Sequence, residues 1–232
     1  MKAIKDLSVV IGVLKLSHKY QVEHLVRRSL PTFTAIYPTS LQKWDIRQTR
    51  RQWSALTEAY GRALPIFVIN IARTIAADTL LPSALFECCA YSYEEIILGV
   101  TTPDGVVHAL HPRDQILVIK ARESLAHFAR NAVFGFIYQK EFMENAVKDP
   151  ERWTGLHRWV QGNDVPGQAH WTNPLDQGFP WNRFFEMTRN LNVTHRKEAE
   201  KDWRSMRRAT WATLPAVFGL SPWDKMKWEP MK

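Results

Sequence analysis

Apolar residues recur at helical spacing near the start of the chain. Residues 10–17 place apolar or small side chains at positions i, i+3, i+4 and i+7, which predicts the buried face of a first helix. A second helix is predicted from about Val22. Pro31 is expected to end or kink it, because proline has no amide hydrogen to continue the helical bonds. Ser40 is then expected to cap a short helix over Leu41–Asp45.

The middle of the chain alternates between a polar segment and apolar helical patterns. Residues 46–62 are polar and basic, which predicts a surface connection. Ala63–Ala77 is apolar on nearly every side and predicts a buried central helix. Pro82 suits the first turn of another helix that reaches Tyr91. The segment Ser92–Glu95 has the serine and glutamate spacing of a capping box, so a helix is expected to begin there.

The remaining pattern predicts a small hairpin and two more helices. Thr102–Gly105 is a turn signal between short β-branched stretches. Asp114 begins the longest helical pattern of the chain. Eight of the ten tryptophans follow Tyr138, among loops rich in glycine and proline, before a basic helix over about Glu198–Thr213. We therefore predict an all-α protein whose C-terminal region is irregular and rich in tryptophan.

Composition and charge indicate a globular protein and bear on the kinds of partner it can bind. The 232 residues are 45% hydrophobic and 23% charged, which is ordinary for a globular protein. The net charge of +8 gathers at the two ends, since residues 1–60 hold ten basic and four acidic residues and residues 191–232 hold nine and five. Such an excess favours anionic partners. The apolar runs are shorter than the ~20 residues of a membrane-spanning helix, so no membrane partner is expected.

The two cysteines are adjacent, at Cys88 and Cys89. A single adjacent pair cannot staple a fold, which favours a reducing compartment, the cytoplasm or the nucleus. Their apolar helical context predicts inert thiols in the core rather than a catalytic nucleophile.

A search for catalytic and cofactor-binding motifs identifies no catalytic, cofactor or metal site. The chain has no GxxxxGK[ST], GxGxxG or GxSxG segment. The one cluster of ligand-like residues is His108 and His111 with Asp104 and Asp114 nearby, and it lacks the residues that would complete a zinc site. An enzyme with an unfamiliar site, which stays a third alternative, would need a deep pocket around His108, His111 and Asp114.

The basic helix near the C-terminus supports two interpretations. Its basic residues, with Trp203 and Trp211 between them, have the composition of a surface that grips phosphates and stacks on bases. Acidic residues are mixed in, however, and Trp203, Met206 and Thr210 fall at core spacing, which is typical of a packed helix with a solvated charged face. The nucleic-acid interpretation rests on Arg204, Arg207 and Arg208.

Four segments of the chain carry a family resemblance. The first, Val13–Leu30, has a Lys-Tyr corner and paired basic residues, and it resembles the last helix pair of the BTB/POZ domain. The other three, in chain order, are Tyr37–Asp45, Leu80–Cys89 and Trp211–Trp223. They are similar to the Tyr-Pro-Thr-x-Leu-x-x-Trp-Asp run, the Leu-Pro segment ending in Cys-Cys and the Trp-x-x-Leu-Pro ending of a large group of fungal BTB-domain proteins.

This resemblance implies a division of the chain into four parts. Residues 1–45 correspond to the C-terminal helices of a BTB-like domain, 46–62 to a basic connection, 63–138 to a helical, BACK-like extension, and 139–232 to the Trp-rich helical C-terminal region. The N-terminal half of the BTB domain has no counterpart, so the resemblance implies a truncated member, a fragment or a product that starts inside the domain. BTB homodimerisation uses that half and is not carried over.

The resemblance also implies a function. The family binds proteins and is not enzymatic, so we expect a protein-binding adaptor without a cofactor or metal. Links to ubiquitin-ligase or transcriptional complexes follow from analogy of fold alone. The first helix pair would lack the sheet on which it normally packs, so a protein-binding apolar patch is expected at Val9, Val10, Val13 and Leu14. The alternative is nucleic-acid binding through the basic helix.

Overall fold

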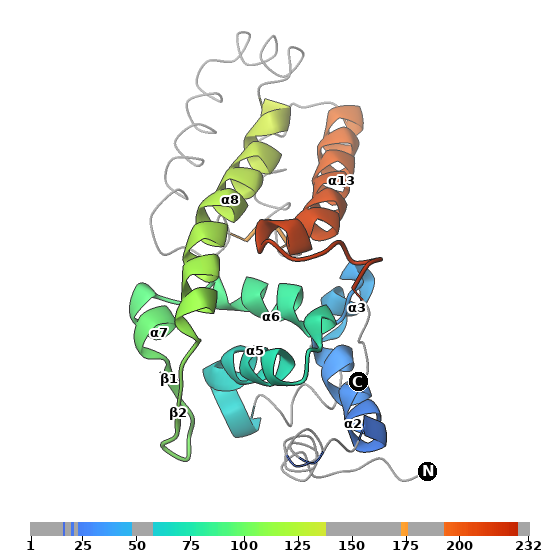
Figure 1. Ribbon diagram of the computed structural model, residues 1–232. Coiled ribbons are helices and arrows are strands. Elements are labelled where there is room, and N and C mark those ends of the chain that lie inside the picture. Colours follow the sequence, from blue (N-terminus) through green and yellow to red (C-terminus); the bar gives the residue numbers. More distant parts are fainter. Residues whose placement is uncertain are drawn as a thin grey trace. The chain divides into compact units, whose positions relative to one another are not determined.

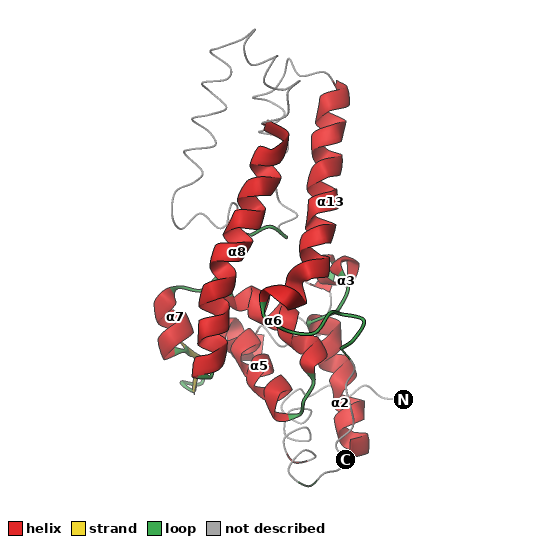
Figure 2. Ribbon diagram, turned by 45° about the horizontal axis from the view of Figure 1, so that its top comes forward, coloured by secondary structure: helices red, strands yellow, loops and turns green. Residues whose placement is uncertain are grey.

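The computed structural model describes residues 16, 20, 23–47, 58–137, 173–175 and 193–226. These residues are mostly helical and include one sheet of two short strands (Figures 1 and 2), which confirms the predicted helical class. The chain divides into two compact units. Unit 1 comprises residues 1–121 and 213–232, and unit 2 comprises residues 122–212.

Unit 1 contains most of the described elements. In chain order they are α2 (Glu23–Ile36), α3 (Leu41–Asp45), η2 (Gly61–Ala63), α5 (Leu64–Thr74), η3 (Asp78–Leu80), α6 (Leu81–Cys88), α7 (Tyr93–Leu98), β1 (Val100–Thr101) and β2 (Val107–His108). Two long helices, α8 (Pro112–Ile137) and α13 (Val193–Val217), each belong partly to unit 1 and partly to unit 2.

The core of unit 1 is built on α5 and α6, which pack against each other through the short η3 between them (Figure 1). Every residue from Leu64 to Ile69 is buried, as expected for a helix that is apolar on nearly every side. Pro65 and Pro82 each lie in the first turn of their helix, where the missing amide hydrogen costs nothing. The predicted central helix is thus confirmed, and α6 ends at Cys88, three residues before the predicted Tyr91.

Of the two effects predicted for Pro31, ending the helix is wrong, since α2 continues through it to Ile36. A proline inside a helix costs about 3 kcal/mol. The residues beyond it offset that cost, because Phe33, Ile36 and Tyr37 are all buried, and burying one large apolar side chain contributes about 1.5–3 kcal/mol.

The helix near the C-terminus is also longer than the sequence pattern predicts. It starts before Glu198 and continues through Pro215 to Val217. It ends in a Schellman motif, with Gly219 at a φ of +64° and the amide of Leu220 donating to the carbonyl of Pro215 at 2.9 Å.

Local capping and turn signals position α7 and the hairpin. Ser40 caps α3 by accepting a bond from the amide of Lys43, and Ser92 forms the predicted capping box with Glu95. The hairpin pairs Val100 with His108 and Thr101 with Val107 in antiparallel register, around the predicted turn at 102–105. The predicted start of α8 at Asp114 is two residues late, because α8 begins at Pro112.

Candidate interaction sites

Exposed apolar side chains gather on one part of unit 1. Among the described residues nine large hydrophobic side chains are exposed, and six of them lie between positions 93 and 116. They come from α7, from the hairpin and from the start of α8, which lie together in Figures 1 and 2. We call this set the α7–hairpin surface: Tyr93, Ile97, Leu98, Val106, Val107 and Ile116.

The geometry of α7 explains why this surface is exposed. Three consecutive apolar residues on a helix spread over about 200°, so they cannot all face one core. Ile96 takes the core position and is fully buried, which leaves Ile97 and Leu98 outside, the latter 70% exposed. The side-chain amide of Gln115 donates to the carbonyls of Ile97 at 2.9 Å and Leu110 at 3.2 Å, and so fixes the end of α7 to the start of α8.

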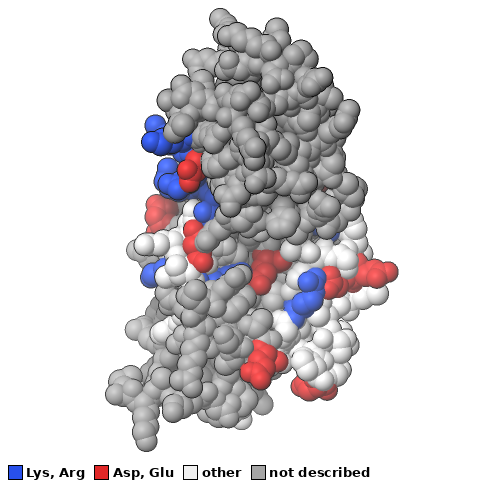
Figure 3. Space-filling model, turned by 180° about the vertical axis from the view of Figure 1, so that it is seen from behind, with Lys and Arg blue, Asp and Glu red and all other residues white. Residues whose placement is uncertain are grey.

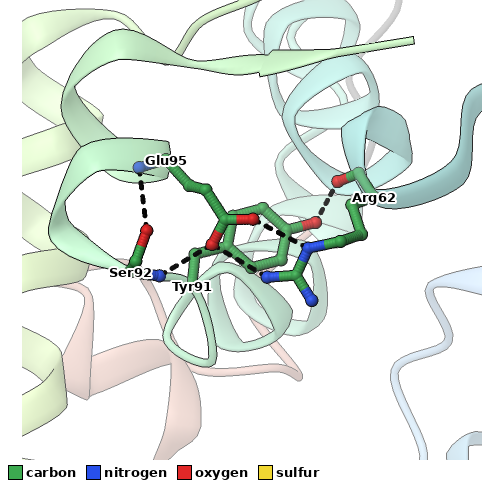
Figure 4. A network of polar contacts seen from close by, with 4 residues as sticks. All are labelled: Arg62, Tyr91, Ser92 and Glu95. Carbon is green, nitrogen blue, oxygen red and sulfur yellow. Dashed lines mark hydrogen bonds and ion pairs between the residues drawn. The ribbon is translucent and has the colours of Figure 1, made fainter. Parts of the chain in front are cut away.

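A polar network anchors the other end of α7 (Figure 4). The guanidinium of Arg62 binds the carboxylate of Glu95 through two parallel bonds of 2.8 and 2.9 Å. The same carboxylate accepts a bond from the backbone amide of Ser92 at 2.8 Å. The hydroxyl of Tyr91, which is buried, donates to the carbonyl of Arg62. Together these bonds join η2, the turn before α7 and its first turn, so the α7–hairpin surface has a fixed base.

This network makes part of the stability depend on pH. The hydrogen bond from Arg62, followed by that from the Ser92 amide, holds the pKa of the Glu95 carboxyl below its usual range. A lowered pKa in the folded state stabilises the fold above the unfolded value of about 4.3, and that contribution is lost as pH falls through the folded pKa. Because Arg62 is largely exposed, we expect at most about 1 kcal/mol.

Denaturant unfolding at several pH values tests this expectation. Glu95→Gln should be less stable than the wild type at pH 7, and the difference should vanish in acid, where the protonated Glu95 resembles glutamine. Glu94→Gln is the matched control, since it removes a charge from the same helical turn. An equal pH dependence in the wild type and Glu95→Gln would contradict the role assigned to this pair.

Two carboxylates border the α7–hairpin surface. Glu94 is exposed in the first turn of α7, and Asp104 is exposed at the hairpin tip. The hydroxyl of Thr102 donates to Asp104, which lowers the pKa of that carboxyl. The apolar surface therefore has a negative charge at each of two borders.

A second cluster joins two of the segments that carry the family resemblance. Arg47 was expected in a surface connection, but it is 5% exposed. Its guanidinium lies 3.2 Å from the centre of the Trp44 ring and binds Glu87 of α6 at 3.1 Å. Trp44 also contacts Phe86 edge to face, with 5.7 Å between ring centres. These contacts attach α3 to α6.

Among the described residues of unit 1, two buried hydroxyls have no hydrogen-bond partner. They belong to Tyr37, directly after α2, and Ser83, in the first turn of α6. Burial also raises the pKa of the Tyr37 hydroxyl well above its ordinary value, with the charge of Glu87 adding to the effect. An unsatisfied buried hydroxyl costs about 1–3 kcal/mol.

The cluster of histidines and aspartates does not form one site. His108 lies edge-on to the rings of Tyr60 and Phe67, 6.0 and 5.7 Å between centres. His111 is exposed, and its Nδ1 accepts from the amide of Arg113. The Asp114 carboxylate binds Arg73 of α5 at 2.6 Å. Within the part of the chain that the structure describes, no three His, Cys, Asp or Glu side chains are grouped as metal ligands.

The two cysteines lie at the end of α6. Cys88 is fully buried, and burial raises the pKa of its thiol well above the ordinary value. Cys89 is half-buried and donates to the carbonyl of Leu85 at 3.4 Å. A raised pKa keeps the Cys88 thiol protonated, which disfavours nucleophilic chemistry.

The three arginines of the nucleic-acid interpretation have different environments in the structure. Arg207 turns inward and donates to the carbonyl of Leu175 through Nε at 3.2 Å and Nη2 at 2.9 Å. Arg204 and Arg208 are exposed on α13, at helical spacing from two exposed lysines. Figure 3 shows that basic and acidic side chains both reach the surface of the molecule on this side. We call these four residues the α13 basic stripe: Lys197, Lys201, Arg204 and Arg208.

The tryptophans of α13 do not accompany this stripe. Trp203 is 3% and Trp211 5% exposed, and Thr210 is buried as well. Of the two interpretations of this helix, the buried rings favour the packed helix with a solvated charged face, in which the tryptophans are core residues at helical spacing.

Sequence analysis missed the α7–hairpin surface. The sequence feature that indicates it is the apolar run Ile96–Leu98, because three consecutive apolar residues of a helix cannot all face the core. The apolar patch expected at Val9, Val10, Val13 and Leu14 lies outside the described residues.

No described helix combines the length and the apolar character needed to cross a membrane. No family model, curated protein or solved structure matches this chain.

Proposed function

We propose that the chain is a non-enzymatic protein-interaction module of BTB type, which acts as an adaptor. The observation that carries the proposal is the α7–hairpin surface. Single exposed apolar residues are ordinary on a protein surface, whereas a group drawn from three neighbouring elements is typical of an interaction site. The four segments that resemble fungal BTB-domain proteins support the family, and by that analogy ubiquitin-ligase or transcriptional complexes are the settings in which such an adaptor would act.

The surface is rigid enough to bind without a large ordering cost. The Arg62–Glu95 pair anchors one end of α7 and Gln115 anchors the other. Hairpin pairing holds Val107 in β2. A binding surface that is already ordered loses less conformational entropy on association, which favours affinity.

The partner that fits is a protein segment with apolar side chains next to lysine or arginine. Apolar anchors match Ile97 and Leu98, and basic flanks match the exposed carboxylates of Glu94 and Asp104. A second copy of this chain would bring the same carboxylates face to face, which disfavours self-association through this surface.

Selection from a library of random displayed peptides on the full chain tests the proposal. We expect selected peptides to combine apolar and basic residues. The double variant Ile97→Ser/Leu98→Ser should weaken their binding at least about tenfold, as truncation of buried anchors does. Ile46→Ser is the matched control, because Ile46 is exposed outside this surface.

Two results would overturn the proposal. One is that the double variant binds the selected peptides as tightly as the wild type does. The other is a concentration-dependent dimer, seen by light scattering, that the double variant abolishes, since the surface would then serve self-association. Circular dichroism of each variant checks that the fold is retained.

A further inference from the structure

The α13 basic stripe has the geometry of a surface for a regular polyanion. Its members are spaced by four, three and four residues, so on a helix with 3.6 residues per turn they fall within about 60° of one another. The stripe covers about 16 Å along the helix axis at a rise of about 1.5 Å per residue. All four side chains are exposed, and the whole stripe belongs to unit 2.

Buried residues on another side of α13 keep the stripe exposed to solvent. Trp203 and Thr210 are buried, and the bonds from Arg207 to the Leu175 carbonyl fix the helix within unit 2. Arg207 is thus an internal anchor, so among the described side chains the exposed basic face consists of the four stripe residues rather than of the arginine triplet in the sequence.

The acidic neighbours whose side chains the structure describes do not cancel the stripe. Glu200 pairs with Arg204 through an exposed i, i+4 contact. Such pairs contribute little and exchange readily with another anion. Asp202 is exposed, but it lies about 100° around the helix from Lys201, at the 3.6 residues per turn of an α-helix.

We infer that the α13 basic stripe binds the phosphate backbone of double-stranded nucleic acid without reading its sequence. A row of four cations at regular helical spacing matches the regular, closely spaced phosphate charges of a duplex. The exposed residues beside the stripe, Ser205 and Ala209, are small and offer no apolar anchor of the kind that protein interfaces use. Single-strand binding through α13 is disfavoured because its tryptophans, Trp203 and Trp211, are both buried, and base stacking on this helix would need an exposed aromatic ring.

The test is fluorescence anisotropy of a labelled mixed-sequence DNA duplex with the full chain over a range of salt concentrations. Four phosphate contacts give a slope of about −3.6 in log K against log salt, so affinity should fall about 150-fold between about 50 and 200 mM salt. Replacing all four stripe residues by glutamine should bring the slope near zero and reduce affinity at low salt more than tenfold, since each phosphate contact contributes about 1 to the slope.

The control variant removes the same charge elsewhere. Glutamine at four exposed basic positions of unit 1 lowers the net charge equally and should leave the slope unchanged; these positions are Lys43, Arg113, Lys120 and Lys225. Equal loss in both variants would overturn the inference, because the binding would then reflect net charge alone. So would binding of polyglutamate or single-stranded DNA as tight as that of the duplex, or no binding of the duplex by the wild type.

Discussion

Gly99→Ala should destabilise unit 1 by about 2–4 kcal/mol, although it adds a single methyl group. Gly99 ends α7 with a φ of +91° and a ψ of −177°, a conformation that costs other residues about 1–3 kcal/mol. A Cβ there would lie 2.4 Å from the backbone oxygen of His108. That oxygen belongs to a residue paired with Val100 across the hairpin, so it cannot move away without disturbing the sheet.

Gly105→Ala separates the two causes. Gly105 has a φ of +84°, but nothing lies within 4 Å of its Cβ position. Gly105→Ala should therefore lower the free energy of unfolding only by the cost of the positive φ, about 1 kcal/mol. Urea unfolding followed by circular dichroism measures both variants. Equal losses of stability would show that the close approach of Gly99 to His108 has no energetic consequence.

Asp114→Ala should lower the free energy of unfolding by about 3 kcal/mol, near the lower end for a broken buried ion pair. The Asp114 side chain is 3% exposed, and it binds the guanidinium of Arg73. Without the carboxylate, Arg73 keeps a charge beside the core and loses its partner there. Partial exposure of Arg73 lets water screen that charge, which keeps the loss below the upper end of about 5 kcal/mol.

A double-mutant cycle with Arg73→Ala isolates the energy of this pair. The coupling should exceed that of the exposed pair Arg204–Glu200, for which about 0.2–1 kcal/mol is expected. Asp114→Asn adds a second comparison, because it keeps an acceptor oxygen but removes the charge. Indistinguishable coupling energies for the buried and the exposed pair would contradict the stabilising role assigned to Asp114.

The parts of the fold that follow from local chemistry were predictable from sequence. Serine before a short polar helix, as at Ser40, and serine three residues before glutamate, as at Ser92, specify helix starts through their own side-chain bonds. The turn at 102–105 likewise follows from residues that favour turns. The buried helix α5 was predictable because its apolar residues surround the axis.

The errors arose where distant contacts override local preference. Pro31 and Pro215 each lie inside a helix. Buried side chains follow both prolines, Phe33 and Ile36 after the first and Phe218 after the second. Arg47 belongs to a polar segment, yet Trp44 and Glu87 enclose its charge. None of these partners is visible in the spacing of neighbouring residues.

The candidate interaction sites were only partly predictable. The sequence showed that α13 is basic, but the inward direction of Arg207 depends on Leu175, 32 positions away. The α7–hairpin surface depends on how three short elements meet, which periodicity alone does not specify.

The order of the units along the chain has a consequence for synthesis. Unit 2 is inserted between two pieces of unit 1, and the second piece contributes Leu214 and Phe218, which are buried. A ribosome therefore releases all of residues 122–212 before unit 1 receives its last core side chains. Domains that are continuous in sequence fold as they emerge, the N-terminal one first. Here synthesis of unit 1 starts before that of unit 2 but ends after it. The apolar residues of unit 1 that Leu214 and Phe218 cover in the folded protein therefore stay uncovered while residues 122–212 are translated.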